Sequence, residues 1–208
     1  FDHPLWISSF SWTTFFVFTG LTFVCSSTFI INQISDEKSD AINKKLFLVG
    51  KYISTEKSKS IAKYLLFSGL LILVLVHWFS ALLVGIIYII WGIIYNQNPY
   101  SWKGKPILGW LANSIVGIIL FSIGWGLVMQ NQSNSAIIPL DISMLTLLLP
   151  YGFCFSSVSL LTTLPDMVGD SSSGDKTFPI VFGKGLTLLI SLVLIIIAFI
   201  VALENNDP

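Results

Sequence analysis

Charged residues are absent from three long stretches of the chain. Residues 3–35, 64–102 and 106–140 contain no Asp, Glu, Lys or Arg. A helix that crosses a membrane needs about 20 apolar residues, so the first and third stretches each fit one crossing. The second stretch fits two crossings, with a turn near residues 77–79. Together with two later apolar runs, the pattern predicts six helices, at residues 5–31, 61–78, 80–97, 107–129, 142–164 and 179–203.

The composition agrees with a membrane protein. Apolar residues make up 54% of the 208 residues and charged residues only 11%, against roughly 25% in soluble domains, and the mean hydropathy is +0.81. The first apolar run is too long for a signal peptide and lacks a basic flank. We therefore expect an all-α fold, a polytopic membrane helix bundle with about six transmembrane helices.

The lysines gather on one side of the predicted membrane. If the helices cross alternately, all eleven lysines and seven of the eleven acidic residues fall in or near the loops after the first, third and fifth helices. The opposite side has four acidic residues and no lysine. Because positive charge marks the cytoplasmic side, we expect an integral protein of a cell or inner membrane, in contact with membrane lipids, whose polar loops face the cytoplasm.

Several classes of function find no support in the composition. The net charge is zero and the chain has no Arg, so no basic patch suggests a nucleic-acid partner. Cys25 and Cys154 fall inside predicted spans, where thiols act as small apolar side chains, and we expect no disulfide. The chain starts with Phe and ends just after a helix, so we expect residues 1–208 to be a single transmembrane domain that is incomplete at both ends.

The first polar loop carries a stripe of oxygen ligands. Asn32, Asp36 and Asp40 are spaced by four residues, which places them on one face of a helix. Like charges at this spacing repel, and a bound cation removes the repulsion. Oxygen ligands favour Mg²⁺, which shares its coordination with waters and substrate phosphates. The alternative is a solvated helix end.

The last polar loop repeats the pattern. Asp166 and Asp170 are again four residues apart, and each lies 130 residues after Asp36 or Asp40, which hints at an internal duplication. Two acidic pairs on one membrane face indicate metal ions that hold a diphosphate. Lys176 is well placed for a phosphate oxygen.

The middle loop, "YNQNPYSWKGKP", has two lysines that could neutralise the remaining charge of such an anion. These are Lys103 and Lys105, and Tyr95 could donate a hydrogen bond or present its ring. Taken alone, the loop is more typical of lysines that extend to a membrane surface. The segment 43–53 mixes lysines with apolar residues and indicates an interfacial stretch, followed by a helix start at Ser54. We expect its lysines to face solvent or headgroups; the alternative is that Lys44 and Lys45 lean toward the metal site.

These motifs resemble the signatures of the UbiA superfamily of intramembrane prenyltransferases. The first signature is Asn-x3-Asp-x3-Asp, at Asn32, Asp36 and Asp40. The second is carried by Asp166, Gly169, Asp170, Gly174, Lys176, Thr177, Pro179 and Gly183. The middle loop is similar to a third family stretch through Tyr95, Pro99, Lys103, Gly104 and Pro106. The chain departs from common family residues at Gln33, Phe47 and Ser101.

The resemblance implies a fragment of a nine-helix prenyltransferase fold, covering its helices two to seven. It implies Mg²⁺ as cofactor and a prenyl diphosphate and a lipophilic acceptor as partners. By motif, the metal ligands would be Asn32, Asp36, Asp40, Asp166 and Asp170, of which the four aspartates form the catalytic set. The diphosphate would meet Lys103 and Lys176, with Tyr95 and Lys105 as further candidates.

The function expected from the resemblance is Mg-dependent transfer of an isoprenyl group to an aromatic or other small lipophilic acceptor. Cations would stabilise the charge that develops on the leaving diphosphate. The alternatives are an ion-coupled transporter and an inactive or structural membrane subunit. A transporter favours ionisable groups near the membrane middle or on both sides, whereas the intact acidic pairs disfavour an inactive subunit.

Overall fold

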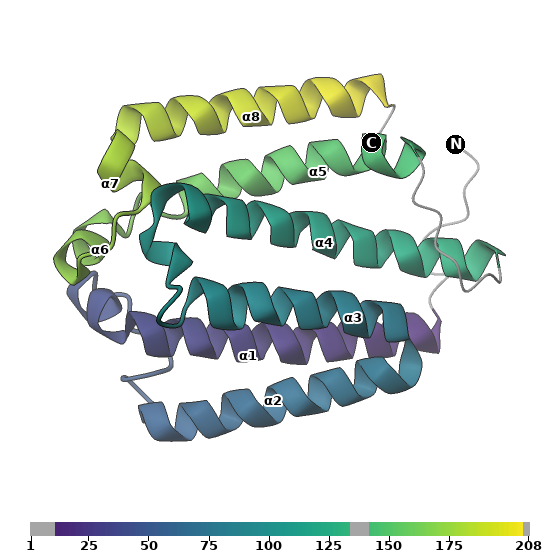
Figure 1. Ribbon diagram of the computed structural model, residues 1–208, viewed down its shortest axis with the longest axis horizontal. Coiled ribbons are helices and arrows are strands. Elements are labelled where there is room, and N and C mark those ends of the chain that lie inside the picture. Colours follow the sequence, from purple (N-terminus) through teal and green to yellow (C-terminus); the bar gives the residue numbers. More distant parts are fainter. Residues whose placement is uncertain (1–10, 134–141, 206–208) are drawn as a thin grey trace.

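The computed structural model describes residues 11–133 and 142–205, and every regular element in these ranges is a helix (Figure 1). The long helices are α1 (Trp12–Ile42), α2 (Thr55–Val76), α3 (Trp78–Ile87), α4 (Pro106–Ser133), α5 (Ile142–Leu161) and α8 (Lys184–Glu204). Short elements are the π-helix η2 (Tyr88–Tyr95), the 3-10 helix η3 (Trp102–Gly104), α6 (Met167–Ser173) and α7 (Phe178–Phe182). The expected all-α class is confirmed.

Six helical segments are long and apolar enough to cross a membrane, as the sequence predicts. They are Trp12–Ile42, Thr55–Val76, Trp78–Tyr95, Pro106–Met129, Ile142–Leu161 and Lys184–Glu204. The predicted start of the first helix, at residues 5–10, lies outside the described residues. Its predicted end is wrong: α1 continues to Ile42, so the first acidic motif lies on a helix. Lys103, from another segment, pairs with Asp36 of this motif, which offsets part of the repulsion along the stripe.

Local capping explains where the helices begin and end. The Ser54 hydroxyl accepts a hydrogen bond from Lys57 N, with Glu56 in the first turn of α2, and this helix start is confirmed. His77 ends α2, and its ring accepts from Ser80 N to cap α3. The last predicted helix is split, because Gly183 takes a positive φ of 85° between α7 and α8. A predicted cap at Asp141 lies outside the described residues.

The long helices lie side by side, with two tight pairs at the edges and a bridge between them (Figure 1). α1 packs on α2, α5 packs on α8, and α4 contacts both α3 and α5. One buried cluster joins α1, α2, α3 and α4. It consists of Val17, Val24, Leu73, Ala81, Val84, Ile87, Val116, Ile123 and Leu127.

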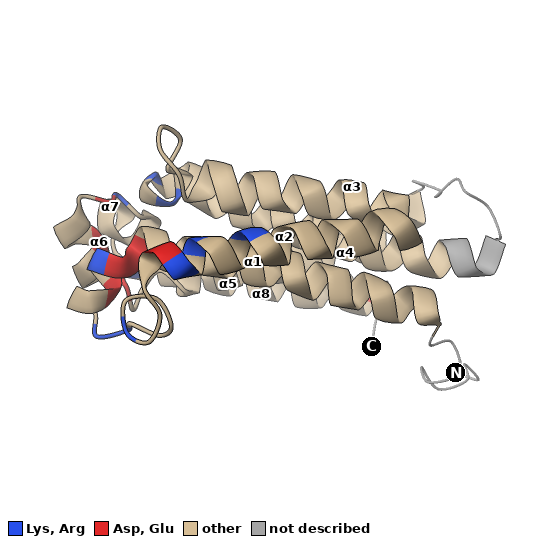
Figure 2. Cartoon of the chain, turned by 90° about the horizontal axis from the view of Figure 1, so that it is seen from below, with Lys and Arg blue, Asp and Glu red and all other residues tan. Residues whose placement is uncertain are grey.

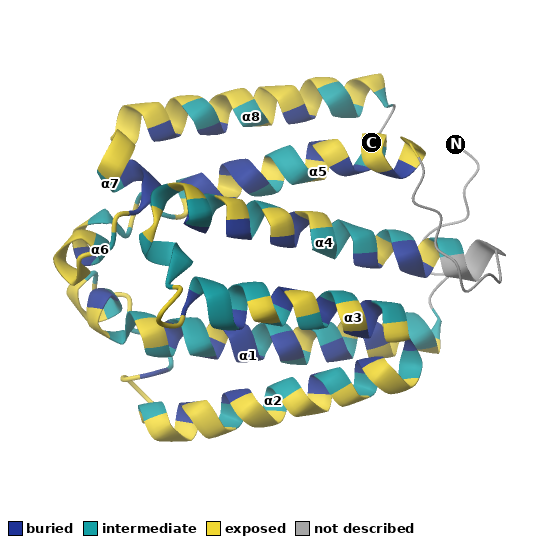
Figure 3. Cartoon of the chain, viewed as in Figure 1, coloured by how far each residue is buried: buried dark blue, intermediate teal, exposed yellow. Residues whose placement is uncertain are grey.

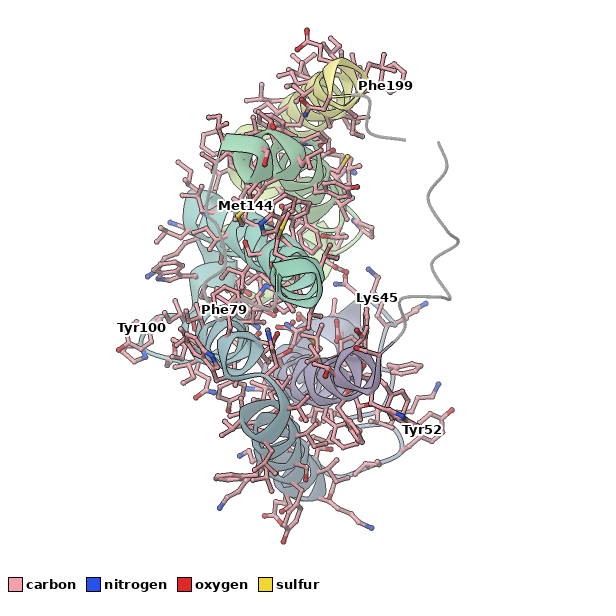
Figure 4. All side chains as sticks on the ribbon, turned by 90° about the vertical axis from the view of Figure 1, so that its right-hand side faces the viewer. Lys45, Tyr52, Phe79, Tyr100, Met144 and Phe199 are labelled. Atoms are coloured by element: carbon pink, nitrogen blue, oxygen red, sulfur yellow. The ribbon has the colours of Figure 1, made fainter. Side chains whose placement is uncertain are left out.

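Most of the outer surface is apolar. Exposed positions run along the outer faces of the long helices (Figure 3), and Leu75 and Ile142 are about three-quarters exposed at 76% and 75%. Figure 4 shows Phe199 at the outer edge of α8, pointing away from the other helices. Water would not tolerate such a surface, whereas lipid tails match it, so the protein is an integral membrane protein.

Serine hydroxyls connect neighbouring helices by single hydrogen bonds to backbone carbonyls. Ser27 Oγ donates to Ala62 O at 2.8 Å between α1 and α2, and Ser157 Oγ donates to Ser191 O at 2.9 Å between α5 and α8. Small hydroxylated residues let helices approach closely where lipid supplies no hydrophobic driving force. Both tight pairs are therefore held by packing plus a hydrogen bond to a backbone carbonyl.

Pro150 lies inside α5 and leaves a carbonyl without its helical donor. Proline has no N–H, so Thr146 O, four residues earlier, cannot receive the usual hydrogen bond. The Asn205 side chain at the end of α8 donates to this oxygen at 2.8 Å. The pairing of α5 with α8 thus satisfies a polar atom that would be costly in lipid.

The charged residues collect at one end of the bundle (Figure 2). The segments after α1, η2 and α5 all lie at this end, as the alternation of predicted helices requires. The three polar loops of the sequence are therefore neighbours in space.

α1 and α2 cross where two glycines meet. A Cβ on Gly69 would lie 2.7 Å from Gly20 O, whereas a Cβ on Gly85 in α3 would meet nothing within 4 Å. We expect Gly69→Ala to lower the unfolding free energy by about 1–3 kcal/mol, the usual cost of overpacking. Gly85→Ala should leave stability unchanged or raise it. Thermal denaturation in detergent compares the two variants, and equal effects would contradict the close crossing.

Candidate active site

A cavity of about 820 Å³ opens between α1, η2, α4 and α5, and it extends to the charged end. Its polar wall combines residues from all three polar loops: Asn32, Asp36, Tyr95, Asn96, Lys103, Asp166, Asp170, Asp175 and Thr177. Its apolar wall includes Leu21, Cys25, Phe29, Trp91, Phe155 and Val158. The cavity can thus take a molecule with an anionic head and an apolar tail.

The polar residues of α1 lie on two faces, one toward the cavity and one toward the segment that follows the helix. Asn32 donates to Asp36 Oδ2 at 2.7 Å, and both side chains line the cavity. Gln33 and Glu37 serve the following loop instead. Gln33 Oε1 accepts from Leu48 N at 2.9 Å, and Glu37 Oε2 accepts from the Thr55 hydroxyl at 2.9 Å. Gln33, one of the departures from common family residues, therefore has a structural role outside the cavity.

Asn43 joins the end of α1 to the second acidic motif. Its side chain accepts from Gly169 N at 2.8 Å and donates to Asp166 O at 3.3 Å. A Cβ on Gly169 would lie 2.3 Å from Asn43 Nδ2 and 2.6 Å from Ser39 O, so only glycine allows this approach. The contact brings Asp166 and Asp170, at the start of α6, to the wall that α1 forms.

Two lysines pair with the carboxylates of the cavity. Lys103, from η3, forms an ion pair with Asp36 and also donates to Ser35 Oγ at 2.8 Å. Its side chain is only 13% exposed, so it is not an interface lysine. Lys45 forms an ion pair with Asp166, although the sequence favoured a lysine facing solvent or headgroups there. Each pair joins two different polar segments.

The middle and last loops also meet through their backbones. Lys176 N donates to Gly104 O at 3.0 Å, and a Cβ on Gly104 would lie 2.3 Å from Asp175 Oδ1. The side chains of Lys176 and Lys105 are exposed and do not contribute to the cavity wall. The structure therefore separates these two lysines from Lys103, which lines the cavity.

η2 shapes the opposite wall. The side chains after it cap its last carbonyls: Asn96 Nδ2 donates to Trp91 O at 2.6 Å, and Gln97 Nε2 donates to Gly92 O at 2.7 Å. Trp91 and Tyr95 line the cavity, and Trp91 Nε1 donates to Asn113 Oδ1 at 2.8 Å. π-helical turns occur often at functional sites, and this one places two aromatic rings in the wall of the cavity that the carboxylates also line.

The electrostatics of the cavity reflect crowded carboxylates. Burial and then the carboxylates of Asp166 and Asp175 raise the pKa of Asp170 to about 6, and Lys103 opposes this shift. Burial lowers the pKa of Lys103, and the carboxylates of Asp175 and Asp170 oppose that shift. Carboxyl groups that resist ionisation in the protein alone are stabilised as anions by a cation.

Most of the predicted site residues converge. Asn32, Asp36, Tyr95, Lys103, Asp166 and Asp170 line one cavity, whereas Asp40 stands behind the wall, near enough to affect the pKa of Asp170. The sequence gave a role near the metal site to Lys45 only as the less favoured alternative, and it did not single out Asn113 or Asp175 as site residues. The Thr177 hydroxyl was also missed: it lines the cavity, is buried, and has no hydrogen-bond partner within the described part of the chain.

The oxygen donors suit a hard divalent cation. No group of three His, Cys, Asp or Glu side chains within residues 11–133 and 142–205 is arranged to hold a metal ion by itself. Mg²⁺ commonly takes one or two protein carboxylates and completes its shell with water and substrate phosphate. Asp36, Asp166 and Asp170, with the free Thr177 hydroxyl nearby, fit a cation of this kind that arrives with an anionic ligand.

Comparisons with known proteins agree with this chemistry. A sequence model of the UbiA prenyltransferase family matches residues 4–205. The chain is 29% identical over 195 residues to the 2-acyl-4-prenylphloroglucinol 6-prenyltransferase, chloroplastic, of Humulus lupulus. That similarity covers 87% of this chain and 46% of the relative, so the chain spans about half the relative's length. No solved structure matches the chain.

Asn43 is expected to stabilise α6. Asn43→Ala removes the acceptor of Gly169 N, so amide exchange in residues 164–176 should become about threefold to tenfold faster, as for one net hydrogen bond. Asn205→Ala removes a comparable side-chain contact at the opposite end and should leave this segment unchanged. Hydrogen–deuterium exchange with mass spectrometry measures both. Unchanged exchange in Asn43→Ala would show that α6 is held by other contacts.

Proposed function

Because the chain belongs to the UbiA prenyltransferase family, we propose that the protein transfers an isoprenyl group, with Mg²⁺, from a prenyl diphosphate to an aromatic or other small lipophilic acceptor. Since the chain spans about half of its relative, we further propose that residues 1–208 are part of one larger transmembrane domain. The lysine-rich end faces the cytoplasm, in accord with the positive-inside rule.

The observation that carries this proposal is the shared cavity. Carboxylates from two motifs 130 residues apart and a lysine from a third segment line the same 820 Å³ space, which continues between apolar side chains. A prenyl diphosphate matches the two parts of the cavity, because it has a charged head and a hydrocarbon tail. A site inside a membrane helix bundle suits this substrate, because its hydrocarbon tail can enter the cavity from the lipid.

Each group in the cavity has a role in this reaction. A divalent cation, on which enzymes of this family generally depend, supplies positive charge against the diphosphate when bound. Asp36, Asp166 and Asp170 would hold it. Lys103 donates hydrogen bonds to phosphate oxygens and stabilises the charge that develops as the carbon–oxygen bond breaks. Lys105 and Lys176 lie outside the cavity wall and contribute only long-range charge.

The apolar wall protects the allylic carbon. Trp91 and Tyr95 present aromatic rings beside the carboxylates, and such rings stabilise a nearby cation by their negative faces. Phe29 and Phe155 exclude water, which would otherwise consume the allylic cation. The relative carries a phloroglucinol acceptor in its name, which supports an electron-rich aromatic ring as the nucleophile.

The alternatives fit the geometry less well. A transporter favours ionisable groups near the membrane middle or at both faces, whereas the described carboxylates and lysines gather at one end except for Glu204 (Figure 2). An inactive structural subunit would have no need for a buried lysine paired with a carboxylate in an open cavity.

Substitution of the acidic ligands tests the cation site. Asp36→Asn and Asp170→Asn should each lower turnover of a labelled prenyl diphosphate by about a hundredfold or more, because each removes charge that stabilises the cation. Glu37→Gln is the matched control: Glu37 follows Asp36 on α1 but faces the Thr55 hydroxyl, and glutamine keeps an oxygen acceptor there. The assay uses Mg²⁺ and a panel of phenolic acceptors. Full activity in excess EDTA would exclude the cation.

The two lysines of the middle loop provide a second test. Lys103→Ala should raise the KM for the prenyl diphosphate about tenfold to a hundredfold, since a charged hydrogen bond contributes roughly 1.5–3 kcal/mol. Lys105→Ala removes the same charge from an exposed side chain and should change KM little. Steady-state kinetics at saturating acceptor separates the two variants. A larger effect at Lys105 would refute the assignment of Lys103.

A further inference from the structure

A second cavity, of about 520 Å³, lies on another face of α1. Its walls come from α1, α2, η2 and the residues that follow η2. Lys59, Lys63 and Asn98 supply polar groups, and Ile31, Leu66 and Tyr88 supply apolar surface. The metal and diphosphate residues face the first cavity, so the second has no role in the proposed transfer.

The wall of the second cavity contains two exposed lysines and no acidic residue. Lys59 and Lys63 are four residues apart on α2, so they lie on one face of that helix. The ion pairs of the described residues are Lys45–Asp166 and Lys103–Asp36, and none of the residues described as lining this cavity is acidic. Asn98 uses its side-chain oxygen for the Ser101 hydroxyl, which leaves its amide N–H groups for an anion.

The position of the two lysines defines the kind of anion. Both lie in the first half of α2 (Thr55–Val76), near the end where charged residues collect (Figure 2), which is the level of lipid headgroups. The apolar residues of the wall belong to helices that continue into the membrane. A ligand that matches both parts has an anionic head and a hydrocarbon chain.

We propose that this cavity binds one anionic phospholipid, with the phosphate at Lys59 and Lys63 and an acyl chain along Ile31, Leu66 and Tyr88. The inference is independent of the proposed enzyme activity. Ser35 and Asn96 also line this cavity. Ser35 Oγ contacts Lys103 and donates to Asn96 O at 3.0 Å, and Asn96 Oδ1 accepts from Asn32 at 2.9 Å. The lipid therefore lies directly behind residues of the first cavity.

The test compares lipids with the same acyl chains. Purified protein in a neutral detergent is titrated with phosphatidylglycerol or phosphatidylcholine, while thermal unfolding and native mass spectrometry record binding. Phosphatidylglycerol should raise the unfolding temperature and remain bound at one molecule per protein, whereas phosphatidylcholine should not. Glycerol phosphate, which has the head but no chains, should bind far more weakly. Equal effects of the two lipids, or of glycerol phosphate, would overturn the proposal.

Charge-matched variants locate the site. Lys59→Gln with Lys63→Gln should weaken phosphatidylglycerol binding about a hundredfold, since a direct hydrogen bond from each ammonium group to the phosphate contributes at least about tenfold. Each single variant should show about tenfold. Lys51→Gln with Lys57→Gln removes the same charge from exposed lysines outside the cavity and should have little effect. Equal weakening in both double variants would mean that the lysines act only through general attraction to anionic lipid, and it would refute the site.

Discussion

Ion pairs between loops hold the charged end of this protein together. Asp36 and Asp166 belong to motifs far apart in the chain, and each is paired with a lysine from another segment, Lys103 or Lys45. Without these ammonium groups, several carboxylates would face one another in a space with little water. Removing one partner of the largely buried Lys103–Asp36 pair is costly because the other charge remains uncompensated, whereas the more exposed Lys45–Asp166 pair contributes less. The pairs therefore set which loops can approach.

The same ion pairs connect structure to function. A carboxylate that contacts an ammonium group has fewer oxygens available for a metal ion, so in the proposed function cation binding and lysine pairing would compete for Asp36 and Asp166. If a cation took the oxygens of Asp36, Lys103, which lines the cavity, would be left beside the diphosphate with its hydrogen-bond donors free. Binding would thus exchange the ion pair between Lys103 and Asp36 for contacts of both groups with the ligands.

The sequence predicted the parts of the fold that depend on local patterns. Charge-free runs located the six spans, helix parity located the polar end, and four-residue spacing located the faces of the acidic motifs. The end of α1 was predicted too early, at residue 31, because the span was ended with the apolar run, although the four-residue spacing already favoured a helical acidic motif. The contacts of Gln33 and Lys45 could not be predicted from local patterns, since the partner of each side chain lies in another segment of the chain. The position of Asp175 beside Gly104 could not be predicted either, because it also depends on a contact between two distant segments.

The length of α1 has a consequence for the membrane in which the protein works. Its 31 residues rise about 46 Å at 1.5 Å per residue, whereas a bilayer has a hydrocarbon core about 30 Å thick. The acidic turns therefore stand at the margin of the membrane, at a height set by the tilt of this helix. A thicker bilayer brings the helix upright and draws these turns toward the headgroups, while a thinner one tilts it. A change in bilayer thickness would therefore alter the depth of these turns, and the water around the carboxylates, only as far as the packing of α1 on α2 lets the helix tilt.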